Sequence, residues 1–295
     1  MLLAGDIGGT KTNLALYSTE LGLVPQAEAT YVSADHPGMR ELLSSFLADA
    51  NMAVDKAVLG VPGPVVGGTA QVTNLPWVVS EEILEDALQV KDVVLLNDLE
   101  ATAYGLPHLS ESDVYLLNDA EPRSGTKVVI APGTGLGEAI FLAKDGHHQV
   151  IASEGGHTDF APTNIFEIRL LRYLMARFGH VSYERVCSGS GLPNIYAYLK
   201  KQRFADELPE MKRLLKKAED PTPIIVQKAM AGECELSIAT LNAFVSILGA
   251  EASNLALKVM ATGGVYLGGG IPPKILSKLK DGTFMASFVN KGRFA

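Results

Sequence analysis

The sequence predicts an α/β protein with two domains. Apolar strand-like runs alternate with amphipathic helical stretches along its 295 residues, a pattern typical of α/β folds. Two apolar hairpin patterns with glycine-rich tips, at residues 2–17 and 126–143, occur one in each half of the chain. The turn-rich stretch 106–125 lies between them and places a domain boundary near residue 110. We therefore expect a smaller domain over residues 1–110 and a larger one over 111–295.

The composition is that of an ordinary globular protein, with 47% hydrophobic and 20% charged residues. The formal charge of -8 gives no support for nucleic acid or an anionic membrane surface as the main partner. Asp6 interrupts the first apolar stretch too early for a signal peptide, and no run of about eighteen apolar residues predicts a membrane span. Cys187 and Cys234 are far apart, which suits a reducing cytoplasm and excludes a cysteine-based zinc site.

The first half of the chain contains a predicted helix and two predicted buried strands after its opening hairpin. Residues 37–50 form an amphipathic pattern with a proline near its start, which favours a helix. The apolar runs 56–61 and 93–96 are typical of buried strands. Asn97 and Asp98 follow the second run directly. Both side chains are therefore expected at the carboxyl end of a strand, where open α/β sheets gather ligands.

The second half of the chain is mainly helical after its own hairpin. Residues 164–178 form an amphipathic helix pattern that a glycine terminates. Thr222 and Pro223 suit an N-cap and the first position of another helix. Residues 235–260 predict one long apolar helix, and 261–275 predict a strand with glycines on both sides.

The opening stretch DIGGTKT is open to two interpretations. Two glycines between strands suit a hairpin turn, because glycine tolerates the positive φ that such turns require. The same residues suit a phosphate site, because unobstructed backbone N–H groups can converge on an anion. The spacing matches neither the P-loop nor the dinucleotide-binding motif. Repetition of glycine-rich segments favours the phosphate site, and these segments are Gly8–Gly9, Gly133, Gly135, Gly137, 263–264 and 268–270.

The ordered motifs identify a family. DIGGTK, TNLPW, LLNDLEATAYGL, APGTGLG, SEGGHTDFAP, HVSYERVCSGSGL, GGVYLGGGI and KGRF together resemble the bacterial glucokinase family of the hexokinase, actin and Hsp70 ATPase superfamily. The resemblance runs from about residue 3 to residue 294. It implies two actin-like, ribonuclease H-like α/β domains with mixed five-stranded sheets around an interdomain cleft. It also implies ATP-dependent phosphorylation of the 6-hydroxyl of glucose.

The resemblance implies roles for five residues at the sugar. Asp98 matches the catalytic base of the family, and Asn97, Asp98, Glu154, His157 and Glu184 match its sugar-binding positions. Each has a plainer alternative when it is taken alone. Asp98 suits the N-cap of the helix that follows, His157 suits a turn, and Glu184 suits a solvated helix.

The resemblance also implies ATP and Mg²⁺ as cofactors, with Asp6 near the metal through water. Taken alone, Asp6 suits a turn in which it accepts backbone N–H groups. Zinc is not expected, because the sequence lacks the three downstream cysteines that hold it in the related repressor and kinase group. The residues expected around the nucleotide are Asp6, Gly8, Gly9, Thr10, Lys11, Gly133, Thr134, Gly135, Gly268, Gly269 and Gly270.

Further expectations concern the motif TNLPW, assembly and the end of the chain. Trp77 is expected in the core and Asn74 near the sugar. The resemblance implies a cytoplasmic homodimer that binds glucose and ATP, without nucleic acid or membrane partners. Family members usually continue past KGRF with a strand and a helix that return to the small domain. Since this sequence stops at Ala295, we expect exposed apolar surface on the small domain and a looser hinge.

Three alternatives to a glucokinase stay open. One is a kinase for another hexose or an N-acetylated sugar. A second is a sugar-sensing regulator. This alternative is disfavoured because there is no room for a helix-turn-helix before the first strand and because Asp98 is present. A third is a chaperone-like ATPase, which is disfavoured because no separate peptide-binding domain follows the nucleotide-binding loops.

Overall fold

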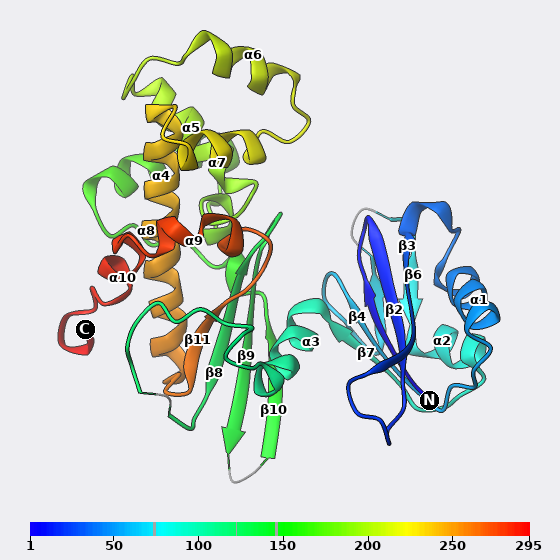
Figure 1. The fold of residues 1–295 in the computed structure, drawn as a ribbon. Helices are drawn as coiled ribbons and strands as arrows, with labels where there is room; N and C mark the ends of the chain where they lie inside the picture. Colours follow the sequence, from blue (N-terminus) through cyan, green and yellow to red (C-terminus); the bar gives the residue numbers. More distant parts are fainter. Residues whose placement is uncertain (73–74, 122, 145–146) are drawn as a thin grey trace. The chain divides into compact units, whose positions relative to one another are not determined.

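The computed structural model describes residues 1–72, 75–121, 123–144 and 147–295, so the expectation for Asn74 lies outside the described residues. The chain folds as two compact units, Met1–Gly105 and Leu106–Ala295 (Figure 1). Each unit has its own mixed sheet and its own hydrophobic core. The mixed α/β architecture predicted from the sequence is therefore present in both units.

The first unit is built on a five-stranded sheet in the order β3-β2-β1-β4-β7. β1, β2 and β3 are antiparallel neighbours, whereas β1, β4 and β7 run parallel, so the sheet is mixed as predicted. A short hairpin, β5 with β6, lies between β4 and β7 in the chain. The strands are β1 (Leu2–Ile7), β2 (Lys11–Tyr17), β3 (Pro25–Val32), β4 (Lys56–Val61), β5 (Thr69–Gln71), β6 (Val78–Ser80) and β7 (Val93–Asn97).

Helices α1 (Met39–Ala50) and α2 (Glu81–Leu88) pack together against this sheet, and α3 (Asp98–Gly105) follows β7 directly (Figure 1). The buried face of α1 includes Phe46 and joins the core around β1, β2 and β4. The helix begins two residues after Pro37, with Gly38 as its N-cap, so the predicted start was too early. Trp77 is 3% exposed in the same core, as the sequence predicted.

The second unit contains a sheet of four described strands in the order β10-β9-β8-β11. β8, β9 and β10 form an antiparallel meander, and β11 pairs in parallel with β8. The resemblance implied five strands here, and within the described ranges the sheet has four. The bounds are β8 (Lys127–Pro132), β9 (Leu136–Lys144), β10 (His147–Ser153) and β11 (Gly264–Leu267).

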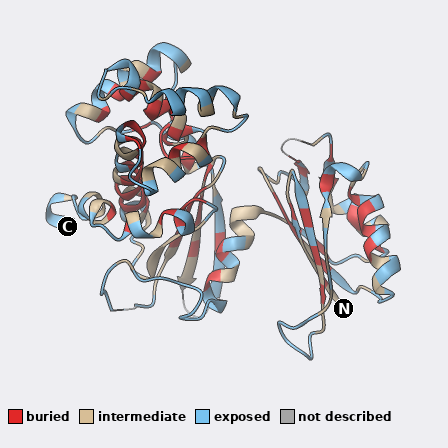
Figure 2. Cartoon of the chain, turned by 45° about the horizontal axis from the view of Figure 1, so that its top comes forward, coloured by how far each residue is buried: buried red, intermediate tan, exposed pale blue. Residues whose placement is uncertain are grey.

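Helices fill the rest of the second unit around the long helix α8, which is largely buried along its middle (Figure 2). α8 is long and apolar enough to cross a membrane, but 72% of its apolar window is buried inside the unit, as in a core helix. The helices are α4 (Ile165–Phe178), α5 (Gly191–Lys201), α6 (Pro209–Lys217), α7 (Thr222–Met230), α8 (Glu235–Val259), α9 (Leu276–Leu279) and α10 (Thr283–Phe288).

Two predicted helix starts have different outcomes. Asn164 caps α4 as an acceptor for the Glu167 N–H at 3.0 Å, which agrees with the predicted start. The N-cap prediction for Thr222 was wrong. Asp220 Oδ1 accepts the Thr222 N–H at 2.9 Å, while Thr222 Oγ1 donates to the Gly189 carbonyl at 2.7 Å. A tertiary contact thus occupies the hydroxyl that local sequence assigned to a cap.

Candidate active site

In the first unit, the predicted carboxylates lie at one end of the sheet. Asp6 is near the carboxyl end of β1 and pairs in register with Gly60 of the neighbouring strand β4. Asp98 begins α3 immediately after β7, on the other side of β4. A β-carbon on Gly60 would lie 3.9 Å from Asp98 Cα. The parallel strands therefore bring Asp6 and Asp98 to the same edge of the sheet, as expected for ligand-binding ends of an open α/β sheet.

Asn97 fixes the backbone from which Asp98 projects. Its Oδ1 accepts the N–H groups of Leu99 at 2.9 Å and Glu100 at 3.3 Å, and its Nδ2 donates to the Gly63 carbonyl at 2.9 Å. Asp98 Oδ1 also accepts the Leu99 N–H, at 2.9 Å. The cap role considered for Asp98 is thus carried mainly by Asn97, which satisfies two of the N–H groups that a helix start leaves without partners.

The first glycine-rich hairpin is a closed turn held by a residue that the sequence did not suggest. Gly8 N–H donates to the Lys11 carbonyl at 2.9 Å, and a β-carbon on Gly8 would lie 2.6 Å from that oxygen. Ser33 donates through its hydroxyl to the Gly8 carbonyl at 2.7 Å and through its N–H to the Thr10 carbonyl at 3.0 Å. Ser33 is fully buried. The turn is therefore fixed from beneath, and only glycine fits at position 8.

In the second unit, three glycine-containing segments meet at the carboxyl end of β8. Gly189 N–H donates to the Gly133 carbonyl at 2.7 Å, and Ser190 N–H donates to the Thr134 carbonyl at 3.2 Å. Ile271 N–H donates to the Pro132 carbonyl at 3.3 Å, and Gly268 N–H donates to Ile130 at 2.9 Å. The predicted nucleotide residues Gly133, Thr134, Gly135, Gly268, Gly269 and Gly270 thus lie together, with the loop 188–191 as an unpredicted third member.

Glu184 contacts the same hairpin. Its Oε2 accepts the Leu136 N–H at 3.1 Å, and a β-carbon on Gly135 would lie 2.5 Å from that oxygen. The loop that follows Glu184 is stabilised by Ser188, whose hydroxyl donates to the Glu184 carbonyl at 2.6 Å. The plain interpretation of Glu184 as a solvated helix residue was therefore wrong, because its carboxylate holds the glycine-rich turn.

Glu154 directly precedes the short 3-10 turn Gly155–His157, and His157 is its last residue. His157 Nε2 lies 3.9 Å from Glu154 Oε2, and both side chains are more than half exposed. Tyr183 N–H donates to the Thr158 carbonyl at 3.0 Å, which joins this turn to the 3-10 turn Tyr183–Arg185 that carries Glu184. The structure thus brings the three predicted sugar residues of the second unit onto two joined turns.

The predicted site residues form two sets, one in each unit. Asp6, Gly8, Gly9, Thr10, Lys11, Asn97 and Asp98 belong to the first unit, and Gly133, Thr134, Gly135, Glu154, His157, Glu184, Gly268, Gly269 and Gly270 belong to the second. Both sets combine exposed backbone turns with carboxylate and amide side chains, a donor and acceptor set suited to phosphate and hydroxyl ligands.

The buried thiol of Cys187 does not suit nucleophilic chemistry. Burial, with Glu251 and Glu138 as neighbouring acids, raises the pKa of Cys187 well above its usual value. The protonated thiol is a weak nucleophile and a weak metal ligand. Among the described residues, no group of three or more His, Cys, Asp and Glu side chains is placed to hold a metal ion.

The donor chemistry at Asp6 fits a magnesium ion held mainly by phosphate and water. The Asp6 carboxylate accepts the Asn13 amide at 3.3 Å and is exposed. Mg²⁺ in phosphoryl-transfer sites usually keeps several waters and takes one or two carboxylates plus substrate phosphates. One exposed carboxylate beside the glycine-rich turn agrees with that coordination and does not form a closed metal cage.

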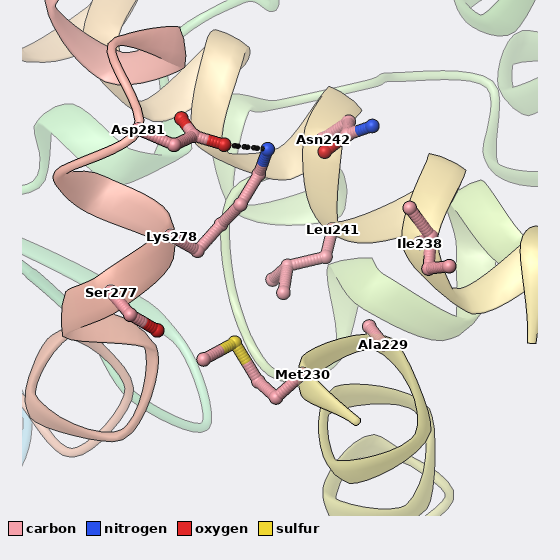
Figure 3. Close-up of a pocket in the computed structure, with 8 residues that line it drawn as sticks. All are labelled: Ala229, Met230, Ile238, Leu241, Asn242, Ser277, Lys278 and Asp281. Carbon is pink, nitrogen blue, oxygen red and sulfur yellow. Dashed lines mark hydrogen bonds and ion pairs between the residues drawn. The ribbon is translucent and has the colours of Figure 1, made fainter. Parts of the chain in front are cut away.

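Figure 3 shows a pocket of about 210 Å³ that lies away from these residues, between α7, α8 and α9. Met230, Ile238 and Leu241 line it, and the ion pair of Lys278 with Asp281 lies at its edge. None of the predicted site residues contributes to this pocket. Its charged groups satisfy each other, so it does not compete as the site of the chemistry.

Comparison with known proteins identifies the family. The sequence model of the glucokinase family matches residues 3–295. The glucokinase of Nostoc punctiforme is 39% identical over 309 residues, which covers 99% of this chain and 91% of that protein. The crystal structure of a glucokinase from an Antarctic psychrotroph is 30% identical, has a TM-score of 0.84, and is matched over 99% of this chain and 89% of that one.

A more distant crystal structure shares the fold. A ROK family glucokinase from Streptomyces griseus in complex with glucose and AMPPNP is 20% identical, with a TM-score of 0.62, over 98% of this chain and 90% of that one. The predicted fold, two actin-like α/β domains, is therefore confirmed. The match over nearly the whole sequence establishes that this chain belongs to the glucokinase family of sugar kinases.

Proposed function

We propose that this chain transfers the γ-phosphoryl group of ATP to the 6-hydroxyl of glucose. The observation that carries the proposal is the position of Asp98, which follows β7 at the same sheet edge as Asp6 in a chain of the glucokinase family. The related glucokinase of Streptomyces griseus holds glucose and AMPPNP on the same fold, which supports paired sites for a hexose and an adenine nucleotide.

The glycine-rich turns supply the phosphate side of this reaction. The N–H groups of Gly8 and Gly133 bond within their own turns, so Gly9, Thr10, Thr134 and Gly135 are the candidates to donate backbone N–H groups to the triphosphate. Lys11 adds a positive charge. Gly268–Gly270 let the adenosine lie close to the backbone. Asp6 would hold Mg²⁺ through water, and the ion would screen the charge on the phosphates.

Asp98 and four further residues from the family motifs supply the contacts to the sugar in this reaction. Glu154 and Glu184 accept from the sugar hydroxyls, and Asn97 and His157 can donate to them or accept from them. Asp98 accepts the proton of the 6-hydroxyl as its oxygen attacks the γ-phosphorus. ADP leaves from the opposite side of the phosphorus. Phosphoryl transfer needs mainly positioning and charge screening, so a correctly placed carboxylate suffices as the base.

The cellular setting follows from the same proposal. A cytoplasmic location is supported by two free, buried cysteines and an acidic composition. A homodimer that binds glucose and ATP, with no nucleic-acid or membrane partner, agrees with the formal charge of -8 and with the family.

Asp98→Asn tests the role of the carboxylate. We expect kcat to fall by at least about 10²-fold while the affinity for glucose is retained, because asparagine keeps the shape and loses the basic oxygen. Asp49→Asn is the matched control, since Asp49 is exposed on α1. Unchanged turnover in Asp98→Asn, measured as ADP release, removes Asp98 from the mechanism.

A panel of sugars tests the reaction itself. Glucose, other hexoses and N-acetylated hexosamines are each incubated with ATP and Mg²⁺, and the products are identified by mass spectrometry. Glucose phosphorylated at its 6-hydroxyl with the highest kcat/KM supports the proposal. A higher kcat/KM for an N-acetylated sugar identifies a different sugar kinase, and the absence of any phosphorylated sugar contradicts the proposed reaction.

A further inference from the structure

A carboxylate with no assigned role lies beneath the turn that carries Glu154 and His157. Glu138 projects from β9 and is 1% exposed. Gly155 lies directly over it, since a β-carbon on Gly155 would collide with Glu138 Oε2. Within the described part of the chain, Glu138 Oε1 is fully buried and has no hydrogen-bond partner. A buried carboxyl oxygen without a hydrogen-bond partner is costly, which calls for a physical reason for its position.

A hydrogen-bonded network of Glu251, Asn254, Tyr183 and Lys291 lies near Glu138, and the charge of Glu251 couples Glu138 to it. Glu251 on α8 is fully buried, and its Oε2 accepts the Asn254 amide at 2.9 Å. The same amide nitrogen donates to the Tyr183 hydroxyl at 2.9 Å, and Lys291 Nζ donates to Asn254 Oδ1 at 2.6 Å. The network therefore connects α8 and Lys291 with the turn that positions Glu184.

The charges in this region do not favour two ionised acids. Lys258 Nζ lies 3.7 Å from Glu251 Oε1, but its side chain is 55% exposed, so solvent screens the pair. Burial lowers the pKa of Lys291 against the opposing effect of Glu251. Burial first, and then the charge of Glu251, raise the pKa of Glu138 from 4.5 to about 7. Cys187, also fully buried, supplies no positive charge.

We propose that Glu138 is a positioning residue whose uncharged carboxyl allows the Gly155–His157 turn to close over it and thereby sets the affinity for the sugar. Ionised Glu138 requires hydrogen-bond donors, and its buried Oε1 has none among the described residues. We infer that ionisation lifts the turn and displaces Glu154 and His157 together. The link between Glu138 and sugar affinity rests on the proposed function. The link between Glu138 and the position of the turn rests only on the contacts between them.

The sign of the pH dependence follows from linkage. If the sugar holds the turn in its closed position, binding favours uncharged Glu138, so affinity is highest below pH 7 and decreases as pH rises through that value. The dissociation constant for glucose increases by up to about tenfold between pH 6 and pH 8.5, the factor for one unit of differential ionisation. The comparison of variants that both retain His157 isolates the contribution of Glu138.

The first experiment measures glucose binding by isothermal titration calorimetry at pH 6, 7 and 8.5. The parent protein is compared with Glu138→Gln, which keeps the shape of the uncharged carboxyl, and with Glu219→Gln, an exposed control. We expect a pH-dependent loss of affinity in the parent and in Glu219→Gln, and a loss at least threefold smaller in Glu138→Gln. Equal pH profiles in the parent and Glu138→Gln overturn the proposal.

A second measurement does not depend on sugar binding. Hydrogen exchange of the segment 153–158 reports the turn directly, because the N–H groups of Gly155, His157 and Thr158 are hydrogen-bonded within it. At pH 8.5 we expect faster exchange of this segment in the parent than in Glu138→Gln, with no difference at pH 6. If the parent and Glu138→Gln exchange at identical rates at both pH 6 and pH 8.5, the positioning role is overturned, even if the protein phosphorylates glucose. If the exchange rates differ as expected but the protein binds no glucose, only the proposed function is contradicted.

Glu251→Gln provides a test that does not require Glu138→Gln to fold. Removal of the neighbouring negative charge lowers the pKa of Glu138, so the pH at which glucose affinity is half lost moves downward. If the pH at which glucose affinity is half lost is the same in Glu251→Gln as in the parent, the coupling between the two buried acids is contradicted.

Discussion

Gly133 and Gly269 allow the phosphate site to be tested separately from stability. A β-carbon on Gly133 would have no neighbour within 4 Å, and its φ is not in the left-handed region. Gly269 has φ +78°, and a β-carbon there would lie 2.7 Å from the Pro132 carbonyl oxygen. Alanine therefore fits the protein at position 133 and does not fit at position 269. A loss of ATP binding in Gly133→Ala alone would report a ligand at that backbone.

The two alanine substitutions are expected to change the free energy of unfolding in opposite directions. Gly133→Ala should change the free energy of unfolding by less than about 1 kcal/mol, with a slight gain from the more restricted unfolded chain. Gly269→Ala should lose about 2 to 5 kcal/mol, about 1 to 2 from the left-handed φ and the rest from contact with the carbonyl. In Gly133→Ala, we expect the KM for ATP to rise at least about tenfold, because the methyl group occupies space predicted for phosphate oxygens.

Urea denaturation followed by circular dichroism gives the free energies, and steady-state kinetics with varied ATP gives the KM. The KM for glucose serves as the internal control, since the substitution leaves Glu154, His157 and Glu184 unchanged. A correctly folded Gly133→Ala variant with the parental KM for ATP would refute the phosphate role of the 133–135 turn.

Three further predictions concern the two units. Asn97→Ala should cost about 1 kcal/mol of stability and also lower kcat, because α3 loses its cap and Asp98 loses its support; a parental kcat would separate the cap from the chemistry. Phe244→Ala should cost about 3 to 5 kcal/mol in urea, since Phe244 is fully buried on α8. The raised pKa of Glu138 means that the folded state holds a proton that the unfolded state releases, so stability decreases between about pH 4.5 and 7 by up to about 3 kcal/mol. Glu138→Gln should remove that decrease in denaturation curves measured at both pH values, and an unaltered decrease would contradict the buried acid as its cause.

Local pattern was sufficient for elements whose residues interact with near neighbours. The run 56–61 forms β4 with the predicted bounds, and Gly179 ends α4 with φ +71°. The two glycine-tipped hairpins are present because alternating apolar residues flank short turns. In α4 and the two hairpins, the hydrogen bonds that define the element join residues close in sequence. β4 instead pairs with the distant strands β1 and β7, and its continuous apolar run was sufficient to predict it.

Features set by distant contacts were not predictable from local pattern. Ser33 lies in an ordinary loop sequence, yet its hydroxyl supports the Gly8 turn. Glu138 looks like an exposed residue of an alternating strand, and tertiary packing, including that of the Gly155 turn, buries it. Thr222 was assigned to a cap because a proline follows it, and its contact with Gly189 was not predictable since the two residues are far apart in the chain. The sugar-binding roles predicted for Glu154, His157 and Glu184 come from the ordered family motifs and not from the spacing of the residues.

The parallel pairing of β8 with β11 has a consequence for biosynthesis. The first unit, Met1–Gly105, can fold while the ribosome is still making the second, whereas β8 must wait for a strand that begins at Gly264. At typical elongation rates this delay is roughly ten seconds. During that interval β9 can pair with one edge of β8, while the edge that later pairs with β11 has no strand partner. Nascent chains of this protein are therefore expected to need chaperone protection mainly after the first unit has formed.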